Sequence, residues 1–473
     1  MHYISTRGQA PRLNFTDTML TGLASDGGLY VPESWPTMSA DELRALANAS
    51  YAEIAAAVLS RFVGETMSAE ELAEDIGAAY GSFRHEATVP LKQLGDNTWL
   101  LELFHGPTLA FKDVALQLLG RFFDRELTRR NRRITVVGAT SGDTGSAAIE
   151  ACRDLSRVDT FILFPEGRVS EVQRRQMTTV PGEHIHAIAI RGNFDDCQDL
   201  VKAMFADVPF RDAVGLSAVN SINWARIIAQ TVYYVSTALR LGAPDRAVGF
   251  AVPTGNFGNV YAAYVARQLG VPIERLIIGT NRNDVLARYF ENGEMRLSAV
   301  EPSLSPSMDI QISSNFERLL FEMLGRDGGA VDGMMKGLRS DGVFSTGDNE
   351  MASIAKLFSA YRADDALTKA TIAEVYEQTG EVIDPHTAAG LAAVKQYRAA
   401  KPADDVPLVS LACAHPAKFP DAVQAAIDVS PSLPPHLADL HDREERMTVL
   451  DNDLQIVEAH IKARSRAAAL NAS

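Results

Sequence analysis

The chain has 473 residues, 46% of them hydrophobic and 22% charged, which is an ordinary globular composition with room for about two to four domains. Asp and Glu number 60 against 45 Lys and Arg, so the formal net charge is -15, and such a surface repels nucleic acid. The most apolar long stretch, residues 227–239, contains Gln230 and falls short of the roughly 20 apolar residues that cross a bilayer. We therefore expect neither a nucleic-acid partner nor a membrane span.

The first residues and the cysteines bear on the compartment. The opening sequence MHYISTRGQAPRLNF shows neither a secretory signal nor an Arg-rich transit peptide, so we expect a cytoplasmic protein. The spacing of Cys152, Cys197 and Cys413 fits neither a zinc site nor a disulfide framework, which predicts reduced thiols. His184 and His186 would share one face of a strand but have no Cys or carboxylate at a matching spacing, so we expect no metal site.

Helical patterns dominate the first part of the chain. Over residues 39–80 apolar positions recur at helical spacing after a turn-rich start that contains Asp26-Gly27-Gly28, which predicts a small helical N-terminal domain over 1–88. After Pro90, short β-branched runs each end in a Gly-rich turn and precede a helical stretch. These runs cover residues 134–137, 161–164, 247–252 and 276–278. Strands that alternate with helices predict an α/β fold whose parallel sheets are covered on both faces.

Two segments rich in Pro and Ser divide the remainder of the chain. Residues 298–307 (SAVEPSLSPS) lie in what we interpret as a loop-rich insertion at about 284–345, within a core domain over 89–430 that has a further strand at 406–412. Residues 430–435 (SPSLPP) lead into a C-terminal helical segment over 431–473. Its apolar residues recur at helical spacing: Met447, Leu450, Leu454, Val457 and Ile461. This helix either packs on the core or forms a dimer interface, so we expect a monomer or a homodimer.

Two loops after predicted strands have the composition of anion-binding sites. The sequence ATSGDTGSAA (139–148) opens a helix, where Ser, Gly and Thr present backbone N–H groups and hydroxyls to a carboxylate or a phosphate. In PTGNFGNVYAA (253–263), Gly255 and Gly258 allow the backbone to wrap around a phosphate. The alternative for each loop is a purely structural Gly-rich turn.

A third candidate is Lys112, in LELFHGPTLAFKDVALQ (101–117). Its apolar neighbours Phe111 and Val114 favour a partly desolvated pocket, in which the amine loses its proton more easily and becomes a nucleophile able to form a Schiff base. The alternative for the lysine is ordinary surface charge, and for Asp113 a plain helix cap. The motifs of P-loop proteins, dinucleotide-binding folds, α/β-hydrolases and zincins are absent from the sequence.

These three sites, in this order, resemble the motifs of the threonine synthase family, which are fold type II pyridoxal-phosphate enzymes. HGPTLAFKD (105–113) is similar to the family's cofactor-lysine motif, ATSGDTGSA (139–147) to its substrate-carboxylate loop and GNFGN (255–259) to its phosphate cradle. Further segments resemble the family in family order: GLASDGGLYVP (22–32), SINWARI (221–227), SSNFER (313–318) and AHPAKFP (414–420). The resemblance implies a tryptophan synthase β-like fold, with parallel sheets in two lobes and a small helical N-terminal domain. The chain length and the insertion resemble the longer fungal and proteobacterial type.

The resemblance also implies a role for each matching residue. Lys112 corresponds to the lysine that binds pyridoxal 5'-phosphate covalently. The residues implied to hold the cofactor phosphate are Gly255, Asn256, Phe257, Gly258 and Asn259. Those implied to hold the substrate carboxylate are Ser141, Gly142, Asp143 and Thr144. For the substrate phosphate the candidates are Ser313, Ser314, Asn315 and Arg318, followed by Asn223, Arg226 and Lys418. The alternative for Arg318 is a structural ion pair.

Cys413 departs from the family pattern. The family usually has a Thr two positions before the histidine, where its hydroxyl meets the pyridine nitrogen, and this chain reads LACAHPAKF there. A thiol is a weaker hydrogen-bond partner than a hydroxyl, and either neutral group leaves the ring nitrogen largely unprotonated. We interpret the change as tuning of the cofactor, and the alternative is that Cys413 is a buried strand residue without ring contact.

The resemblance implies conversion of O-phospho-L-homoserine and water to L-threonine and phosphate, with Lys112 as nucleophile and then as general base and acid. Two alternatives remain open. A serine or threonine dehydratase of the same fold would share Lys112 but has no need of a second anion site or of the N-terminal domain. A catalytically silent homologue that binds phosphorylated metabolites would be expected to lose Lys112 or the phosphate cradle, and both are present.

Overall fold

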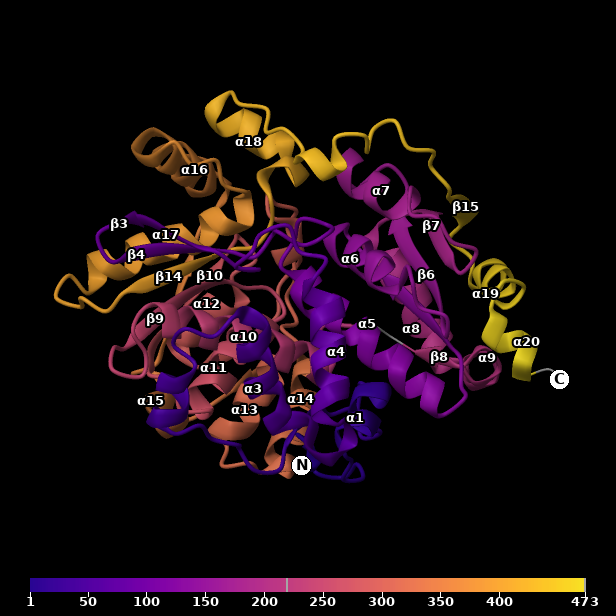
Figure 1. Cartoon of the computed structure of the whole chain (residues 1–473), viewed down its shortest axis with the longest axis horizontal. Helices are drawn as coiled ribbons and strands as arrows, with labels where there is room; N and C mark the ends of the chain where they lie inside the picture. Colours follow the sequence, from indigo (N-terminus) through magenta and orange to yellow (C-terminus); the bar gives the residue numbers. More distant parts are fainter. Residues whose placement is uncertain (218–219, 472–473) are drawn as a thin grey trace. The chain divides into compact units, whose positions relative to one another are not determined.

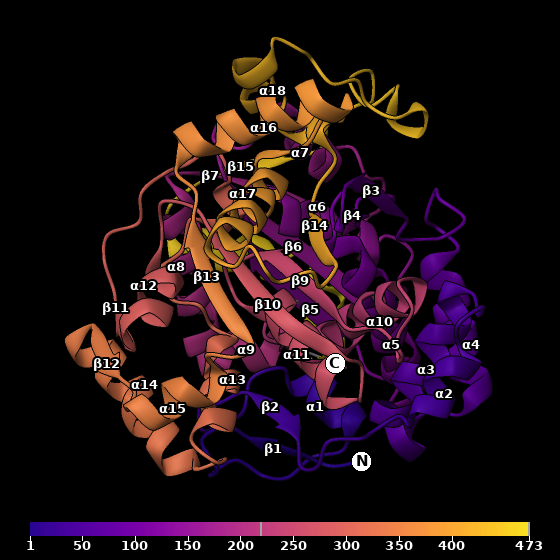
Figure 2. The same ribbon diagram turned by 90° about the vertical axis from the view of Figure 1, so that its left-hand side faces the viewer.

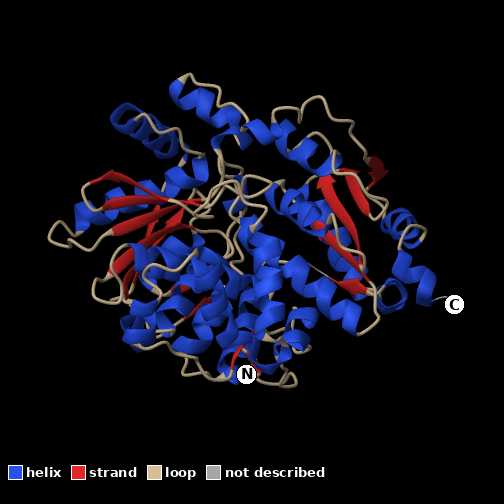
Figure 3. Cartoon of the chain, viewed as in Figure 1, coloured by secondary structure: helices blue, strands red, loops and turns tan. Residues whose placement is uncertain are grey.

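The computed structural model describes residues 1–217 and 220–471, which form two compact units (Figure 1). Unit 1 comprises Met1–Gly77, Phe83–His105 and Ser221–Pro431. Unit 2 comprises Ala78–Ser82, Gly106–Asn220 and Ser432–Ser473. Each unit contains a mainly parallel sheet covered by helices, which confirms the predicted α/β class (Figure 3). The domain boundaries given above stay predictions.

The main sheet of unit 1 has six strands. In spatial order they are β13 (Phe358–Arg362), β10 (Ile273–Thr280), β9 (Val248–Pro253), β14 (Leu408–Ala412), β4 (Thr98–Glu102) and β3 (Leu91–Gly95). Neighbouring strands are parallel except β3 and β4. Every residue of β9 and β14 is buried, as expected for apolar strands in a sheet covered on both faces. The strands predicted in this part of the chain are confirmed, with small differences at their ends.

Helices cover both faces of this sheet (Figures 1 and 2). One face carries α10 (Trp224–Arg240) and α11 (Gly258–Gln268), and the other carries α16 (Asp365–Thr379) and α17 (Pro385–Ala400). Helix α17 lies very close to the sheet, because a Cβ atom on Gly390 would be only 2.7 Å from Ser410 Oγ of β14. Helix α18 (Pro420–Ile427) follows the short 3₁₀ turn η3 (Pro416–Lys418).

The N-terminal part of unit 1 is helical, as predicted. After the antiparallel pair β1 (Tyr3–Ser5) and β2 (Tyr30–Pro32), with α1 (Phe15–Thr21) between them, come α2 (Ala40–Ala45), α3 (Tyr51–Val63), η1 (Gly64–Thr66) and α4 (Ala69–Tyr80). Ser50 caps α3 in a reciprocal box with Glu53. Asp26 closes the turn-rich start by accepting hydrogen bonds from Ser5 Oγ and from the N–H groups of Gln9, Ala10 and Gly28.

The segment predicted as a loop-rich insertion contains several helices. Its elements are α12 (Val285–Asn292), β11 (Glu294–Arg296), η2 (Pro306–Met308), α13 (Phe316–Met323), α14 (Gly328–Asp341) and β12 (Val343–Ser345). Strands β11 and β12 pair antiparallel to each other, apart from the main sheet. Helix α15 (Asp348–Ile354) then leads into β13. The Phe316 ring packs edge-on against Tyr289 and Phe257, which ties α13 to α12 and to the start of α11.

Unit 2 contains a five-stranded sheet in which all pairs are parallel. In spatial order the strands are β15 (Thr448–Asp451), β7 (Ile185–Arg191), β6 (Val158–Pro165), β5 (Ile134–Ala139) and β8 (Leu216–Ser217). The helices of the unit are α5 (Lys112–Arg129), α6 (Asp143–Cys152), α7 (Glu171–Thr178), α8 (Phe194–Ala206), α9 (Val208–Val214), α19 (Leu454–Lys462) and α20 (Arg466–Asn471), with η4 (Pro435–Leu437) before β15. Phe161 and Ile188 of the sheet form one apolar core with residues of α8 and α19.

The prediction of one C-terminal helix that begins near Met447 was wrong for its first part. Leu450 lies in β15, which adds a strand beside β7 and pairs Leu450 with Ile190. The helix begins only at Leu454, where the Asp453 side chain accepts a hydrogen bond from Ile456 N. The apolar spacing of three and four fits a helix, but the sheet edge offered by β7 decides the conformation, because backbone N–H and C=O groups there need partners.

Cys152, Cys197 and Cys413 are buried, and none of them forms a disulfide within the described residues. None of the described helices is long and apolar enough to cross a membrane. His186 lies in β7 and stacks on Phe161 with ring centroids 4.3 Å apart, while His184 Nε2 lies 3.0 Å from the Arg153 carbonyl oxygen. The described residues include no group of three side chains able to hold a metal ion.

We expect His186 to make unit 2 sensitive to acid. Burial, with the nearby charges of His460 and Arg464, lowers the pKa of His186 from 6.5 to about 4. Between these values the unfolded chain binds a proton that the folded chain does not, so stability falls as the pH drops through this window. His186→Phe keeps the ring stack and should flatten the pH dependence of the unfolding temperature. Exposed His441 gives a matched control, His441→Gln, and equal acid sensitivity in both variants would contradict the prediction.

Candidate active site

Lys112 is the first residue of α5 and is buried, with 8% of its side chain exposed. Its Nζ atom lies 3.4 Å from Asp143 Oδ2 and 4.9 Å from the centroid of the Phe111 ring. Val114, in the same first turn of α5, is fully buried. The alternative of ordinary surface charge is therefore wrong. A buried amine beside one carboxylate is suited to attack on a carbonyl carbon and to proton transfer.

The loop between β5 and α6 supplies that carboxylate. Gly142, the N-cap of α6, has φ of +136°, and a Cβ atom there would collide with the Gln173 side chain. Gln173 Nε2 donates to Asp143 Oδ1 at 2.9 Å, so α7 positions the carboxylate whose other oxygen faces Lys112. Ser141 and Thr144 are half-buried on the same loop. The predicted placement of residues 141–144 at a helix N-terminus is confirmed, and their binding of a carboxylate stays a prediction.

Asp113 closes the turn that precedes α5. Its carboxylate accepts hydrogen bonds from Thr108 N at 2.8 Å and Thr108 Oγ1 at 2.6 Å. Gly106 is required by this turn, because a Cβ atom there would lie 2.5 Å from Asp113 Cβ. Gln176, on α7, donates a hydrogen bond from Nε2 to the Thr108 carbonyl oxygen at 3.1 Å. Asp113 is thus not a plain helix cap: it holds the HGPT segment against the turn that carries Lys112.

In unit 1 the 255–259 loop follows β9 and opens α11. Phe257, the N-cap, has a left-handed conformation with φ of +62°, and no side chain caps the helix. The SSNFER segment holds the loop, because Ser313 Oγ donates to the Gly255 carbonyl at 2.7 Å and Asn315 donates to the Asn256 carbonyl from both N and Nδ2 at 3.0 Å. Ser313 and Asn315, predicted to bind substrate phosphate, here support the predicted cofactor loop.

Asn259 provides a test of whether this loop suits a phosphate. Its Oδ1 accepts hydrogen bonds from the hydroxyls of Tyr233 and Tyr234, the latter at 2.7 Å. Its buried Nδ2, by contrast, has no partner among the described residues. A buried amide donor without an acceptor is costly, and an anion at the N-terminus of α11 would satisfy it together with the free N–H groups of the first helical turn. The loop therefore fits a cofactor phosphate.

Arg226 on α10 is a buried cation that no carboxylate of residues 1–217 and 220–471 pairs with. Only 3% of the residue is exposed, and its Nε and Nη1 atoms have no hydrogen-bond partner in the part of the chain that the structure describes. Burial lowers the pKa of Arg226 to about 10. The electrostatic effect of Tyr233, which is also on α10, opposes this shift. Removing a guanidinium from water without compensation is expensive, so this arrangement favours a bound anion.

Arg318 and Asn223 have structural partners instead. Arg318 is fully buried and donates from Nε to the Tyr30 carbonyl at 3.0 Å, from Nη2 to the Ile222 carbonyl at 2.7 Å, and from Nη1 to Asn315 Oδ1. Asn223 caps α10 through Ala225 N and donates to a carbonyl of α1. Of the other candidates, Ser314 is half-buried before α13 and Lys418 is fully buried in η3.

Cys413 follows the end of β14 and is buried. Because β14 and β9 are parallel neighbours, the carboxyl end of each faces the same edge of the sheet, which brings Cys413 and the 255–259 loop to one edge. Cys413 N donates to Thr387 Oγ1 at 3.1 Å. The thiol also lies near Tyr234, whose pKa is raised chiefly by burial and further by Cys413. Tyr234 therefore connects the two predicted cofactor contacts, Asn259 and Cys413.

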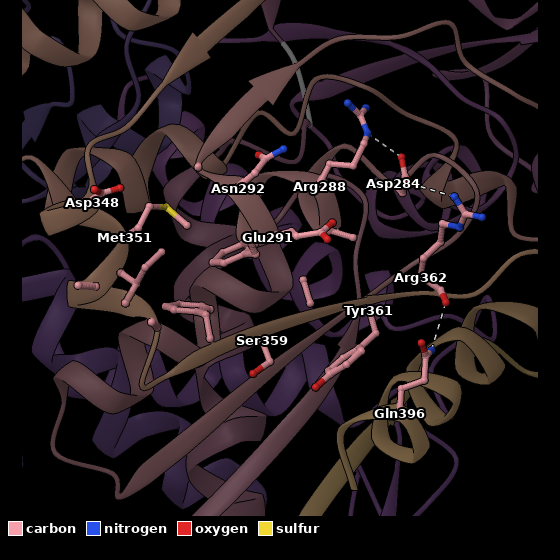
Figure 4. A pocket seen from close by; sticks show the side chains of 18 residues that line it. Asp284, Arg288, Glu291, Asn292, Asp348, Met351, Ser359, Tyr361, Arg362 and Gln396 are labelled. Atoms are coloured by element: carbon pink, nitrogen blue, oxygen red, sulfur yellow. Dashed lines mark hydrogen bonds and ion pairs between the residues drawn. The ribbon is translucent and has the colours of Figure 1, made fainter. Parts of the chain in front are cut away.

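A cavity of about 790 Å³ lies elsewhere in unit 1, among residues of α12, α15 and β13 (Figure 4). Asp284 there binds both Arg288 and Arg362, at 2.9 and 3.2 Å. None of the predicted site residues belongs to the described lining of this cavity.

Sequence reasoning missed several residues that shape the site. These residues hydrogen-bond to predicted site residues but lie on helices that are distant from them in the sequence: Gln173, Tyr233, Tyr234 and Thr387. The only local signal was the Ser170-x-x-Gln173 capping box, which indicates a helix start and no more.

Comparisons with known proteins agree with this geometry. Family models match residues 2–80 (Threonine synthase N terminus), 84–413 (Pyridoxal-phosphate dependent enzyme) and 387–461 (Threonine synthase, C-terminal). The threonine synthase of Pseudomonas aeruginosa is 54% identical over 462 residues, which cover 98% of each chain. The crystal structure of threonine synthase from Brucella melitensis, with pyridoxal phosphate bound, is 55% identical with a TM-score of 0.96 and covers 98% of this chain and 100% of that one. The yeast enzyme is 39% identical with a TM-score of 0.93 and 98% coverage of both chains.

These matches decide between the alternatives left open by the sequence. The matches over the N-terminal and C-terminal parts of the chain favour threonine synthase over a dehydratase. A silent homologue would be expected to lose Lys112 or the phosphate cradle, and both are present. They also confirm the fold type II architecture and pyridoxal phosphate as the cofactor. The chain belongs to the threonine synthase family of pyridoxal-phosphate-dependent lyases.

Proposed function

We propose that this enzyme converts O-phospho-L-homoserine and water to L-threonine and phosphate, with Lys112 as its catalytic residue. The observation that carries the proposal is the buried Lys112 amine beside Asp143, within a chain that matches the family along its length. A small phosphorylated amino acid also agrees with the buried donors Asn259 Nδ2 and Arg226 of unit 1, which no described residue satisfies.

The chain's own groups suit the cofactor at three points. Lys112 supplies the primary amine that binds the cofactor aldehyde covalently. The first-turn N–H groups of α11 and the Asn259 amide hold the phosphate. Cys413 would contact the pyridine nitrogen of the cofactor, and its neutral thiol would leave that nitrogen largely unprotonated. When bound, pyridoxal phosphate supplies a conjugated system that accepts the electron pair left on the substrate's α-carbon.

Lys112 then moves protons. Its Nζ, when not bound to the cofactor, would remove the α-proton of the substrate, and the same group would return a proton later in the reaction. Asp143, held by Gln173, keeps Nζ oriented. Ser141, Gly142 and Thr144 bind the substrate carboxylate at the N-terminus of α6. Loss of a β-proton, departure of the γ-phosphate, protonation at Cγ and addition of water at Cβ complete the conversion.

Among the candidates for the substrate phosphate we favour Arg226. Arg226→Met removes an unpaired buried charge and keeps an apolar side chain of similar length. We expect the Michaelis constant for O-phospho-L-homoserine to rise roughly 10- to 100-fold, the effect of one lost charge-assisted hydrogen bond or ion pair. The affinity for pyridoxal phosphate, measured by titration of the cofactor-free protein, should change little.

Arg318→Met is the comparison variant. Its guanidinium binds the Tyr30 and Ile222 carbonyls, so we expect a lower unfolding temperature and a smaller change in the Michaelis constant. A reversed pattern would return the substrate phosphate to Arg318. If Arg226→Met weakens cofactor binding as much as substrate binding, its charge serves the cofactor phosphate.

The direct test of the function is the ratio of threonine formed to phosphate released when the cofactor-loaded protein receives O-phospho-L-homoserine. A ratio near one establishes the proposed reaction. Phosphate without threonine would show elimination without addition of water and would direct attention to Cys413. Neither product would contradict the proposed substrate.

The remaining expectations belong to the same proposal. We propose that the enzyme acts in the cytoplasm as a monomer or a homodimer and has neither a nucleic-acid nor a membrane partner. The net charge of -15 supports the absence of a nucleic-acid partner. Size-exclusion chromatography with light scattering on the full chain distinguishes the two oligomeric states.

A further inference from the structure

Asp384 is a fully buried carboxylate that makes more hydrogen bonds than a helix cap needs. As the N-cap of α17 it accepts from His386 N at 2.9 Å and Thr387 N at 3.3 Å. The same two residues also bind it through their side chains, because His386 Nδ1 lies 2.8 Å from Oδ1 and Thr387 Oγ1 donates to Oδ2. A buried anion is tolerated only when its oxygens are satisfied in this way.

His386 carries this contact to the phosphate loop. Ser307 N donates to His386 Nε2 at 3.3 Å, so Nε2 is the acceptor and Nδ1 holds the proton that faces Asp384. Ser307 in turn lies directly against the loop, because a Cβ atom on Gly255 would be 2.9 Å from the Ser307 carbonyl oxygen. The Phe419 ring packs edge-on against His386 at 4.8 Å and fixes the imidazole plane.

Thr387 carries the second contact, to the end of β14. Its hydroxyl donates to Asp384 and accepts from Cys413 N at 3.1 Å, so one hydroxyl joins the carboxylate to the Cys413 backbone. The helix that presents both residues has little freedom to shift, because Gly390 and Gly279 allow it to lie directly on β14 and β10.

We infer that Asp384 is a positioning residue, which through His386 and Thr387 holds the backbone of Cys413 and the backbone beside Gly255 in fixed positions. The inference rests on the proposed assignment of Cys413 and the 255–259 loop to the cofactor. Asp384 itself need not touch the cofactor: it fixes the separation of two contacts at one edge of the sheet. A cofactor held at both its ring and its phosphate is sensitive to that separation.

The test compares Thr387→Val with Thr387→Ser. Valine keeps the shape of threonine but leaves Cys413 N and one Asp384 oxygen without the hydroxyl, whereas serine retains it. We expect valine to raise the dissociation constant for pyridoxal phosphate about tenfold, the effect of one unsatisfied buried donor, and to shift the absorption band of the bound cofactor. Serine should restore both values. The measurement is a titration of the cofactor-free protein followed by absorption.

Asp384→Asn provides the second variant. Asparagine is also a good N-cap, so the helix keeps its start, but its amide cannot accept from both His386 and Thr387. We expect weaker cofactor binding and a shifted band here too. Asp364→Asn is the matched control, because Asp364 caps α16 through Leu367 N. If Thr387→Val fails to fold, the Asp384→Asn and Asp364→Asn pair decides.

The inference would be overturned if Thr387→Val had the same cofactor affinity and the same absorption spectrum as the unmodified chain. Equal effects of Asp384→Asn and Asp364→Asn would overturn it too. These titrations contain no substrate. Failure of the proposed reaction would instead show as missing threonine with the unmodified, cofactor-loaded enzyme, so the two failures are distinguishable.

Discussion

Replacing Lys112 with alanine is expected to lower kcat for threonine formation by at least about 10⁴-fold, because the only proposed nucleophile and proton carrier is lost. The fold should persist, since the side chain lies at the start of α5 and its contacts, among them those to Asp143 and Phe111, are local to this site. The measurement combines turnover with far-UV circular dichroism of the same sample. Substantial residual turnover would remove Lys112 from the mechanism.

Chemical trapping gives this prediction an independent readout. Reduction of the loaded enzyme with borohydride should fix the cofactor on the peptide that contains Lys112, and mass spectrometry locates it. Buried Lys418 is the informative competitor, and label found there would contradict the assignment. The control variant is Lys202→Ala, which changes an exposed lysine paired with Asp199 and should leave turnover unchanged.

Glu317→Ala is expected to destabilise unit 1 by about 3–5 kcal/mol, because it removes the nearer carboxylate of the buried Arg7 guanidinium and leaves Asp332, whose Oδ1 lies 4.0 Å from Nη1. Arg7 and Glu317 are 3% and 4% exposed and form a two-pronged ion pair, with distances of 3.1 Å from Nε and 2.9 Å from Nη2. Thr6 Oγ1 adds a third hydrogen bond to the same carboxylate at 2.6 Å. Urea-induced unfolding, followed by tryptophan fluorescence, measures the loss.

The matched control is Asp199→Ala, which breaks an exposed pair with Lys202 and should cost at most about 1 kcal/mol. A double variant, Arg7→Met with Glu317→Met, should recover much of the loss, because neither charge is then left buried alone. Equal effects of Glu317→Ala and Asp199→Ala would show that the buried pair contributes no net stability.

This ion pair joins the N-terminal segment to the SSNFER segment (313–318). Glu317 binds the segment that follows β1, and the next residue, Arg318, binds the carbonyl of Tyr30 in β2. The same short helix start holds the phosphate loop through Asn315. The N-terminal β1–β2 pair and the 255–259 loop are therefore connected through two neighbouring turns of chain.

The sequence by itself determined the α/β class, the strands that precede each loop and the positions of the two Gly-rich loops. Each of these features is local: a β-branched run followed by glycines forms a strand and a turn wherever the chain is placed. The 139–148 and 255–259 loops were predicted for this reason, whereas Lys112 was predicted from its apolar neighbours, and the motifs around all three also indicated the family. The same local reasoning failed at Leu450, where an open sheet edge converts a helical pattern into strand β15.

Only the tertiary structure decided which of the charged motif residues are available to a ligand. Arg226 and Arg318 both lie in family motifs, and nothing in their neighbouring residues distinguishes them. Arg318 is occupied by carbonyls of Tyr30 and Ile222, whereas Arg226 is buried with two nitrogen atoms that no described residue satisfies. Whether a buried cation is structural or available to an anion depends on hydrogen-bond acceptors from distant parts of the chain. Burial of the charge is unfavourable unless an acceptor compensates for the lost water, and the fold determines which acceptors lie close enough to do so.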